Sequence, residues 1–503
     1  MNPMKTQKTT LSAAGIALMA LVVAGCAVGP DFQRPGAPAV SRYTAQPLAS
    51  PTVSAATPAG EAQRFADGQD IPAQWWTLFH CEALNALIAS ALHNNPDLQA
   101  AEAALRNARE SVAAQRGAYF PSVDAQLLPT RQSIAGTLAS PQAAGASLYS
   151  LYTAQLNISY VPDVFGSNRR QVESLEAQAQ AQRFQREAAY LTLTSNLVAA
   201  AIQEGSLRAQ IGATHGIIAA AAQQLEMVRK QRAAGQIGAA DVAAQETVLA
   251  QAQATLPPLE KQLAQQRHLL AVLASRFPGE GIASTFELAS LTLPQELPLS
   301  LPSRLVEQRP DIRAAEAQWH AASAQIGVAK ANRLPNITLT AGAGSAALEW
   351  SQLFAAGSGF WGIGADLVQP LFNGGTLLHR QRAAEATYAQ AAAQYRSTVL
   401  TAFQNVADTL QAIQSDAAAL ATAAAAEQAA GKSLAIARRQ WTLGATNYLP
   451  VLSAEQAHQQ TAIALVQAQA SRYADSAALF QALGGGWWNR EDSGSDARSG
   501  KAQ

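Results

Sequence analysis

The most restrictive feature of this sequence is an internal repeat: one pattern of about 210 residues occurs twice within the 503-residue chain. Residues 95–103 are matched by residues 309–317, which lie 214 positions later, and Pro121 matches Pro335 at the same separation. Phe165-Gly166 corresponds to Phe372-Asn373-Gly374, with 207 residues between the two phenylalanines. A third block recurs after 209 residues: Arg229, Gln231, Gly235, Val242 and Glu246 become Arg438, Gln440, Gly444, Val451 and Glu455. Because three blocks keep nearly one spacing in the same order, the chain is expected to use one structural unit twice.

Each copy reads as helix, strand, turn, strand, long helix, tight turn and long helix. Polar and apolar residues alternate with period two in four segments, as in strands with one polar and one apolar face. The alternating segments are residues 123–127, 155–160, 336–343 and 361–367. The chain therefore offers four strands of roughly membrane-spanning length, about 9–11 residues each.

The segments that follow these strands have the heptad spacing of packed helices. Apolar residues recur every seven positions in two series, Val242, Leu249, Leu256, Leu263, Leu270 and Val399, Val406, Ile413, Leu420. Residues 168–234 would extend about 100 Å as one helix, although Gly205, Gly212 and Gly216 could bend or interrupt it. The leucine series continues through Pro257-Pro258, which predicts a kinked helix and not a helix end.

The N-terminus resembles a lipoprotein signal peptide. Lys5 and Lys8 precede an apolar run at residues 11–23, which ends in Val23-Ala24-Gly25-Cys26. Removal of residues 1–25 would leave Cys26 as a lipid-carrying N-terminal residue, anchored by buried acyl chains. Residue 27 is Ala, whereas Asp after the lipid-carrying cysteine usually keeps a bacterial lipoprotein from being sorted to the outer membrane. The sequence therefore favours the outer membrane. The alternative is an ordinary secretory signal that contains a cysteine by chance.

Composition excludes several classes of protein. The 35 basic residues balance the 35 acidic ones, and only 14% of residues are charged, so a nucleic-acid partner is not expected. The later apolar runs are alanine-rich with little transfer energy, so a bilayer crossing would have to use the strands. The expected organisation is a signal peptide (1–25), a lipid-anchored extended segment (26–70), a first repeat (71–283), a second repeat (284–483) and a disordered tail (484–503).

Four strands cannot close a barrel, and a sheet edge in lipid would leave backbone groups unpaired. Three copies would supply twelve strands, an even number within the range of bacterial outer-membrane barrels. The expected fold class is therefore a mixed α/β membrane protein. It combines a trimeric 12-stranded β-barrel, with four strands per chain, and a long α-helical coiled-coil barrel continuous with it.

Several motifs together resemble the outer-membrane factors of tripartite efflux pumps, in the lipoprotein (NodT-type, OprM-like) branch of the TolC-like family. They are residues 28–35 (Val-Gly-Pro-Asp-Phe-Gln-Arg-Pro), Trp75-Trp76, Asn95-Pro96-Asp97, Arg309-Pro310-Asp311 and Leu371-Phe372-Asn373-Gly374-Gly375. The resemblance covers nearly the whole mature chain. It implies a homotrimeric exit duct in the outer membrane, with a long periplasmic portion, that passes drugs or other small toxic compounds. It also implies two protein partners, a periplasmic adaptor and an inner-membrane pump, usually of the proton-driven resistance–nodulation–division class.

By this resemblance, the turns at residues 233–236 and 443–446 are periplasmic tips that contact the adaptor, through Gly235, Gln236, Gly444, Ala445 and Thr446. Glycine at a tight helix reversal agrees, because it tolerates positive φ.

The duct is expected to close at side chains just after the tips, where the family often has carboxylates. Asp241 follows the first tip, whereas Ser453 stands where an acid is common after the second. Asp241, Tyr448 and Ser453 are therefore the gate candidates, and a solvated surface role is the alternative for Asp241 and Tyr448.

Nothing in the sequence favours catalysis or a cofactor. It contains no Gly-x-Ser-x-Gly elbow and no ligand spacing for a metal, and Cys81, adjacent to His80, is expected to be a half-buried structural thiol. Two other functions remain: an exit duct for type I-like secretion, and a periplasmic coiled-coil lipoprotein that scaffolds the envelope. The scaffold does not explain four alternating strands.

Overall fold

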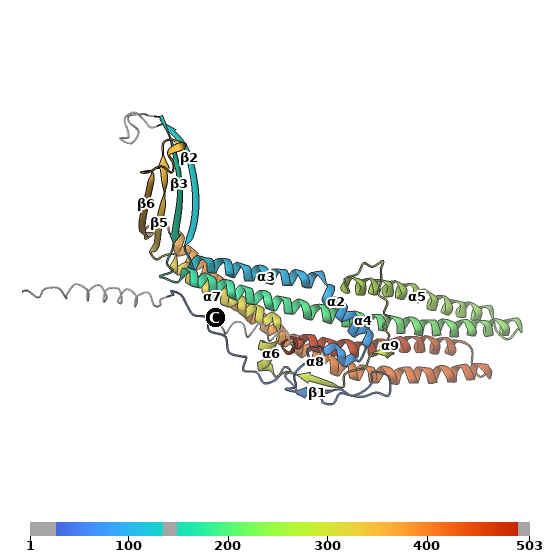
Figure 1. The fold of residues 1–503 in the computed structure, drawn as a ribbon. Helices are drawn as coiled ribbons and strands as arrows, with labels where there is room; N and C mark the ends of the chain where they lie inside the picture. The colour runs from blue at the N-terminus through green and yellow to red at the C-terminus, as the bar shows by residue number, and fades with distance from the viewer. Residues whose placement is uncertain (1–26, 134–147, 491–503) are drawn as a thin grey trace, which may run out of the picture. The chain divides into compact units, whose positions relative to one another are not determined.

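The computed structural model describes residues 27–133 and 148–490 (Figure 1). The predicted signal peptide, the predicted lipidation site Cys26 and the last part of the predicted tail lie outside these residues. Within the described residues, no helix is both long enough and apolar enough to span a membrane.

The elements follow the predicted order in both copies. The first copy contains α2 (Glu82–Asn94), α3 (Pro96–Arg116), β2 (Ser122–Ser133), β3 (Leu148–Tyr160), α4 (Ser167–Ala233) and α5 (Ala239–Leu273). The second contains α6 (Pro302–Gln308), α7 (Pro310–Ala331), β5 (Asn336–Ala347), β6 (Gly359–Val368), α8 (Thr376–Thr442) and α9 (Leu449–Ala482). The described residues also contain two short strands, β1 (Arg64–Asp67) and β4 (Glu296–Leu299). They contain five short 3-10 helices as well: Trp75–Phe79, Gly117–Tyr119, Leu288–Ser290, Trp350–Gln352 and Trp487–Asn489.

The long helices are continuous. Each first arm, α4 and α8, has 67 residues. The three glycines of α4 do not interrupt it; a Cβ on Gly205 would lie 2.9 Å from the backbone nitrogen of Leu288, so this glycine permits close packing. Helix α5 continues through Pro257 and Pro258, as the uninterrupted leucine series predicts.

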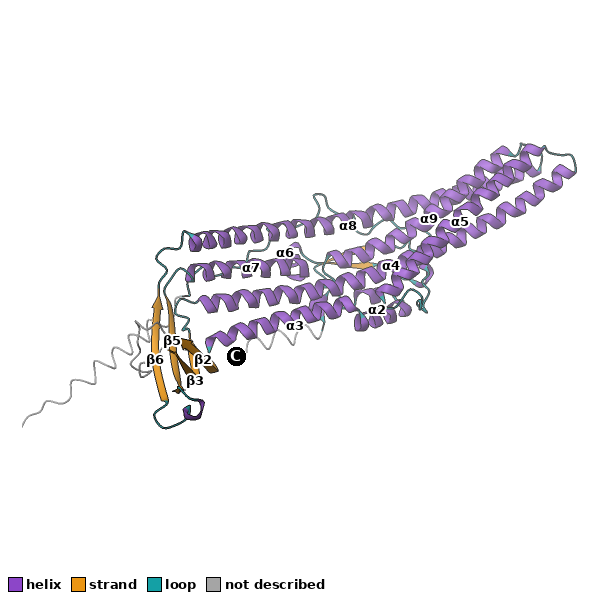
Figure 2. Ribbon diagram, turned by 90° about the horizontal axis from the view of Figure 1, so that it is seen from above, coloured by secondary structure: helices purple, strands orange, loops and turns teal. Residues whose placement is uncertain are grey.

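The four long strands form one antiparallel sheet in the order β2-β3-β5-β6 (Figure 2). Its register pairs Ser122 with Ser159, Tyr160 with Leu339, and Asn336 with Val368. This register brings the starts of β2 and β5 and the ends of β3 and β6 to one end of the sheet, where the chain connects them to α3, α7, α4 and α8. Strands β2 and β6 have one neighbour each and are the edges of the sheet.

The chain packs into two compact units that cut across the repeat. Unit 1 comprises Met1–Arg34, Ala104–Gln182 and Ala315–Tyr395, and it contains the four-stranded sheet. Unit 2 comprises Pro35–Ala103, Arg183–Ala314 and Arg396–Gln503, and it contains both helical tips. Each unit takes segments from both copies, so neither copy is a domain that folds alone.

The core of unit 2 includes residues that the sequence placed outside the folded body. Strand β1 pairs in parallel with β4, and the buried Gln63 side chain donates to the carbonyl of Pro294 at 2.9 Å and to Ser476 Oγ at 2.8 Å. The predicted extended segment therefore includes a buried residue, Gln63, and a short paired strand, in which Arg64 and Asp67 are exposed. Cys81 is 6% exposed, more deeply buried than predicted.

The prediction of a disordered tail is wrong for residues 484–490. Gly484, Gly485 and Gly486 all have positive φ, and a Cβ on any of them would lie less than 3.0 Å from another atom. The run is thus a tight turn in close packing, not a flexible linker. It leads to Trp487, which is buried and donates from Nε1 to the carbonyl of Gln308 at 2.6 Å.

Candidate functional site

The two helical tips close with the same backbone motif. Gly235 and Gly444 have φ of +74° and +71°, and the next residue in each tip donates its N–H five residues back, from Gln236 to Gln231 and from Ala445 to Gln440, at 2.9 Å. This is the Schellman arrangement, in which a glycine in the left-handed region ends the helix. The conserved spacing of 209 residues between the copies therefore reflects a repeated helix-reversal geometry.

The return helices begin differently after the two tips. The Asp241 carboxylate accepts a hydrogen bond from the N–H of Gly238 at 3.1 Å and caps the first turn of α5. Helix α9 begins instead with Leu449 and Pro450. Proline suits the first turn of a helix because it has no N–H, and an N–H there would have no acceptor within the helix.

The two hairpins share one apolar core within unit 2. Its buried residues are Leu225, Val228, Val242, Leu434, Ala437, Trp441, Tyr448, Val451 and Ala454. Both repeated valines, Val242 and Val451, belong to it. Trp441 lies with its ring centroid 5.0 Å from that of Tyr448, so the last turn of α8 is fastened to the first turn of α9.

Tyr448 joins the second tip to the first by its hydroxyl group, which donates to Gln245 Oε1; the Gln245 amide in turn donates to the carbonyl of Ala221 at 3.1 Å. Tyr448 is 2% exposed, and burial, with the nearby charge of Glu455, raises the pKa of its phenol above the ordinary value. The surface alternative for Tyr448 is therefore wrong, because its side chain is in the tip core.

An ion pair also repeats between the copies. Arg229 donates to Glu246 at 2.9 Å across the first hairpin, and Arg438 donates to Glu455 at 3.0 Å across the second. The first pair is half exposed, whereas Glu455 is 5% exposed. The same contact thus has a solvated form in one hairpin and a buried form in the other, and the buried form depends more strongly on its partner.

The predicted contact and gate residues divide by exposure. Gly235, Gln236, Gly444, Ala445 and Ser453 are exposed, and Asp241 and Thr446 are half-buried. The sequence reasoning missed Leu443 and Leu449, which flank the second tip and are 74% and 66% exposed. Leu443 follows the last residue of α8 and does not continue the seven-residue series of that helix, and Leu449 is the first residue of α9.

The sheet in unit 1 keeps polar and apolar residues on opposite faces. Cross-strand pairs on the polar face include Asp124 with Asn157, Gln126 with Gln155, and Thr338 with Asp366. Pairs on the other face include Ala125 with Leu156, Ala341 with Ile363, and Ala343 with Trp361. Ile363 and Trp361 are 80% and 78% exposed, so this chain alone leaves the apolar face uncovered.

Among the described residues, no group of three or more His, Cys, Asp and Glu side chains is placed to hold a metal ion. The gate and tip candidates have no arrangement of nucleophile, base and acid, and their visible chemistry is helix reversal, packing and surface exposure.

Comparisons with known proteins agree on the family. The profile described as "Outer membrane efflux protein" matches residues 87–275 and 301–485, close to the two copies of the repeat. The toluene efflux pump outer membrane protein TtgC of Pseudomonas putida is 30% identical over 483 residues, covering 96% of this chain and 97% of the relative. The pyoverdine export outer membrane protein OpmQ of the same species is 31% identical over 442 residues, covering 87% and 93%. The solved structure of the outer-membrane channel OprN superposes with a TM-score of 0.81 at 26% identity, covering 92% of this chain and 100% of that one.

Proposed function

Because this chain belongs to the outer membrane efflux protein family, we propose that three copies of it form the exit duct of a tripartite efflux pump. The duct would receive small toxic compounds from a periplasmic adaptor and an inner-membrane pump of the resistance–nodulation–division class and release them outside the cell. Relatives named for toluene efflux and pyoverdine export support small molecules as the cargo.

The observation that carries the proposal is the open sheet of unit 1. It has two unpaired edges, an exposed apolar face and a polar face, and a sheet with these properties is not stable as an isolated element in lipid. Joining β2 of one copy to β6 of the next satisfies both edges, and three copies close twelve strands around a polar lumen. A periplasmic scaffold would need none of these features.

The tips are the proposed adaptor contact. The exposed backbone at Gly235 and Gly444 and the exposed side chains of Gln236, Ala445, Leu443 and Leu449 offer a mixed polar and apolar surface. In a protein interface the two leucines would belong to the apolar core and the polar groups to the rim.

The gate would combine an exposed side chain with a rigid support. Ser453 and Asp241 are the residues proposed to meet their symmetry copies near the duct axis, with Tyr448 holding the second tip against the first through Gln245. Because Asp241 also caps α5, its movement would be coupled to the first turn of that helix.

The first experiment is the molar mass of the mature protein in mild detergent, by light scattering corrected for bound detergent. We expect three times the protomer mass. The same protein should restore solvent or antibiotic tolerance to a strain that lacks its own outer-membrane efflux channels but keeps an adaptor and pump. A stable monomer would contradict the duct, and restored secretion of a protein without restored tolerance would favour type I-like secretion.

Lipidation of Cys26 is proposed on the sequence alone. The intact mass of the mature protein should exceed that of residues 26–503 by the mass of a lipid, and a Cys26→Ala variant should lack this increment. An identical mass for the two proteins, apart from the substituted atoms, would exclude the lipid.

A further inference from the structure

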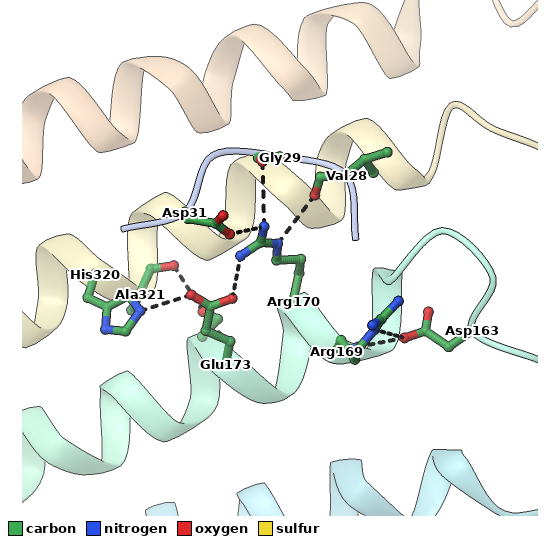
Figure 3. Close-up of polar contacts among 10 residues, drawn as sticks. Val28, Gly29, Asp31, Asp163, Arg169, Arg170, Glu173, His320 and Ala321 are labelled. Carbon is green, nitrogen blue, oxygen red and sulfur yellow. Dashed lines mark hydrogen bonds and ion pairs between the residues drawn. The ribbon is translucent and has the colours of Figure 1, made fainter. Parts of the chain in front are cut away.

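Residues 27–34, here named the N-terminal strap, lie in a slot of unit 1 between α4 and α7 (Figure 3). The N–H of Val28 donates to the carbonyl of Phe165 at 3.1 Å, in the turn that connects β3 to α4. The strap begins one residue after the proposed lipid-carrying Cys26. Its path therefore decides where a lipid anchor leaves the folded protein.

Glycines make the slot deep enough for a backbone. A Cβ on Gly327 of α7 would lie 2.8 Å from the carbonyl oxygen of Val28, and a Cβ on Gly166 would lie 2.6 Å from the Cα of Ala27. Gly29 itself has φ of +113°, and a Cβ there would lie 2.5 Å from the Cα of Gly327. Side chains larger than hydrogen at these positions would expel the strap, so the fit is between two backbones.

Arg170 of α4 closes the slot over the strap. Its guanidinium group is 7% exposed and donates to Asp31 Oδ1 at 2.7 Å, to the carbonyl of Val28 at 3.3 Å and to the carbonyl of Gly29 at 3.5 Å. Glu173, one turn along α4, accepts from Arg170 at 2.7 Å and also contacts His320 Nε2 at 2.9 Å. Burying a guanidinium group costs free energy unless hydrogen-bond acceptors replace the lost water. Three of the acceptors around Arg170 belong to the strap, so the strap compensates part of this cost.

The far end of the strap is held by α7. The Phe32 ring stacks on His320 at 4.5 Å between centroids and meets Trp319 edge-on at 5.4 Å. Arg34 pairs with Glu316 at 2.9 Å. Backbone, charge and aromatic contacts thus follow one another along eight residues of the strap.

The internal repeat provides a control for this interpretation. Helices α4 and α8 are related by 209 residues, so Arg170 corresponds to His379; at the separation of 214 that relates α3 and α7, Gly327 corresponds to Ala113 and Trp319-His320 to Leu105-Arg106. The second copy keeps a glycine in the strand-to-helix turn, Gly374, but has no counterpart of the Arg170 guanidinium group or of Gly327, and Phe372 there is 92% exposed. The slot residues are additions to the repeated unit and not parts of its general packing.

We propose that this slot is a docking site for the N-terminal strap in the same chain, and that Arg170 is the residue that positions the lipid anchor. Docking holds Ala27 against Gly166 and Val28 against Phe165, in the turn that follows β3, so an acyl chain on the preceding residue would enter the bilayer next to the strands. Tyr43 is also held, because its hydroxyl donates to the carbonyl of Ser300 at 2.9 Å. A tether there without the slot would leave about 17 residues before the lipid, a length of chain that reaches roughly 60 Å. The lipid part of this inference rests on the proposed lipidation of Cys26, whereas the docking part does not.

Hydrogen–deuterium exchange on the purified full-length mature trimer tests docking. In the wild type, the Val28 amide and its neighbours should be protected. Arg170→Leu, which removes the guanidinium group and keeps an apolar side chain, should speed exchange in residues 27–34 at least tenfold with little change in the rest of α4. Arg169→Leu is the matched control, because the neighbouring Arg169 pairs with Asp163 and not with the strap. Rapid exchange of the strap in the wild type, or an unchanged strap in Arg170→Leu, would overturn the docking site.

A second measurement tests positioning of the lipid. Arg170→Leu and Arg169→Leu are each made in the lipid-carrying protein and in a Cys26→Ser protein exported with a non-lipoprotein leader. We expect Arg170→Leu to reduce the yield of membrane-inserted trimer several-fold only when the lipid is present. An equal reduction in both backgrounds would assign Arg170 a purely structural role and overturn positioning. The intact mass of the wild type shows separately whether Cys26 carries a lipid. If it does not, the lipid part of the proposal fails, but hydrogen–deuterium exchange still tests docking of the strap.

Discussion

At the scale of single residues, the tips depend on two glycines that share one backbone conformation. Gly444 has positive φ, and nothing lies within 4 Å of the position of a Cβ built on it. A substitution there therefore meets no steric neighbour and changes the conformational energy alone. The tip is thus a place where backbone geometry can be tested separately from packing.

We predict that Gly444→Val reduces efflux while trimers persist. A β-branched residue in the left-handed region costs roughly 1–2 kcal/mol, which the exposed tip can relieve by changing shape. Thr442→Val is the matched control, because Thr442 is exposed, has no positive φ and is not one of the proposed adaptor contacts. Drug tolerance in a channel-deleted strain is the measurement; wild-type tolerance with Gly444→Val would contradict a role of the tip shape in efflux.

A second residue-scale prediction concerns the carboxyl of Asp475 in α9. Burial raises its pKa from 3.8 to about 7, and the hydrogen bond and charge of Asp416 in α8 add to the effect. The folded protein therefore keeps a proton that the unfolded chain releases near pH 4, and the stability from this proton is lost as the pH rises from about 4 to 7. Asp475→Asn keeps a neutral group at every pH.

The thermal midpoint of Asp475→Asn relative to wild type should therefore be higher at pH 8 than at pH 5. Because the group is half-buried, the gain should be about 1 kcal/mol. Asn405→Ala, which replaces an exposed neutral residue of α8, is the control and should show no such trend. A constant difference between Asp475→Asn and wild type across this range would contradict the raised pKa.

At the scale of elements, the segment after α9 fastens unit 2. Trp487 packs edge-on against Phe184 with 5.8 Å between ring centroids, and Arg490 lies 4.0 Å from the ring centroid of Tyr190. Asn489 donates to the carbonyl of Ile71 at 2.8 Å. These contacts join residues 487–490 to α4 and to the segment before α2.

We predict that Trp487→Ala destabilises the protein by about 3–5 kcal/mol, as expected for a buried tryptophan that leaves a cavity. The lost Nε1 donor also leaves the carbonyl of Gln308 unpaired. The neighbouring Trp488 is more exposed, so Trp488→Ala should cost clearly less. Denaturation followed by helix circular dichroism compares them; equal losses in the two variants would argue against Trp487 as the anchor of this segment.

At the scale of the whole molecule, the open sheet must be completed by other chains. We expect the two faces of the sheet to differ in their tolerance of a charged side chain. The polar face toward the lumen should tolerate one, whereas the apolar face toward lipid should not. Ile363 of β6 lies on the apolar face, and Thr338 of β5 lies on the polar face opposite Asp366. The two positions therefore allow the same substitution to be tested on both faces.

Ile363→Arg should strongly reduce membrane-inserted trimer, since arginine in the middle of the lipid-facing band costs about 2–4 kcal/mol per chain. Thr338→Arg, beside Asp366, should leave trimer assembly near the wild-type level. Trimer yield from purified outer membranes is the measurement. The reverse order of the two variants would show that the faces are assigned the wrong way round.

Local periodicity was enough to predict much of this molecule. A period of two identified all four long strands and the composition of their faces, and the heptad series identified the uninterrupted helices, because both patterns arise from the geometry of a single element. The repeat also predicted the equivalence of the tips: Arg229 with Glu246 and Arg438 with Glu455 make the same contact at the same spacing.

Tertiary structure decided what each residue contacts over long separations. Tyr448 is a core residue because Gln245 of the other hairpin accepts a hydrogen bond from its hydroxyl group. Gly484–Gly486 are ordered because Pro72, Leu191 and Gln308 pack against them. The strap slot could not be predicted from the repeat, because Arg170 and Gly327 lie at positions where the two copies differ. The pattern of one helix or strand records which face is apolar, but the partner of that face depends on distant segments brought together by packing.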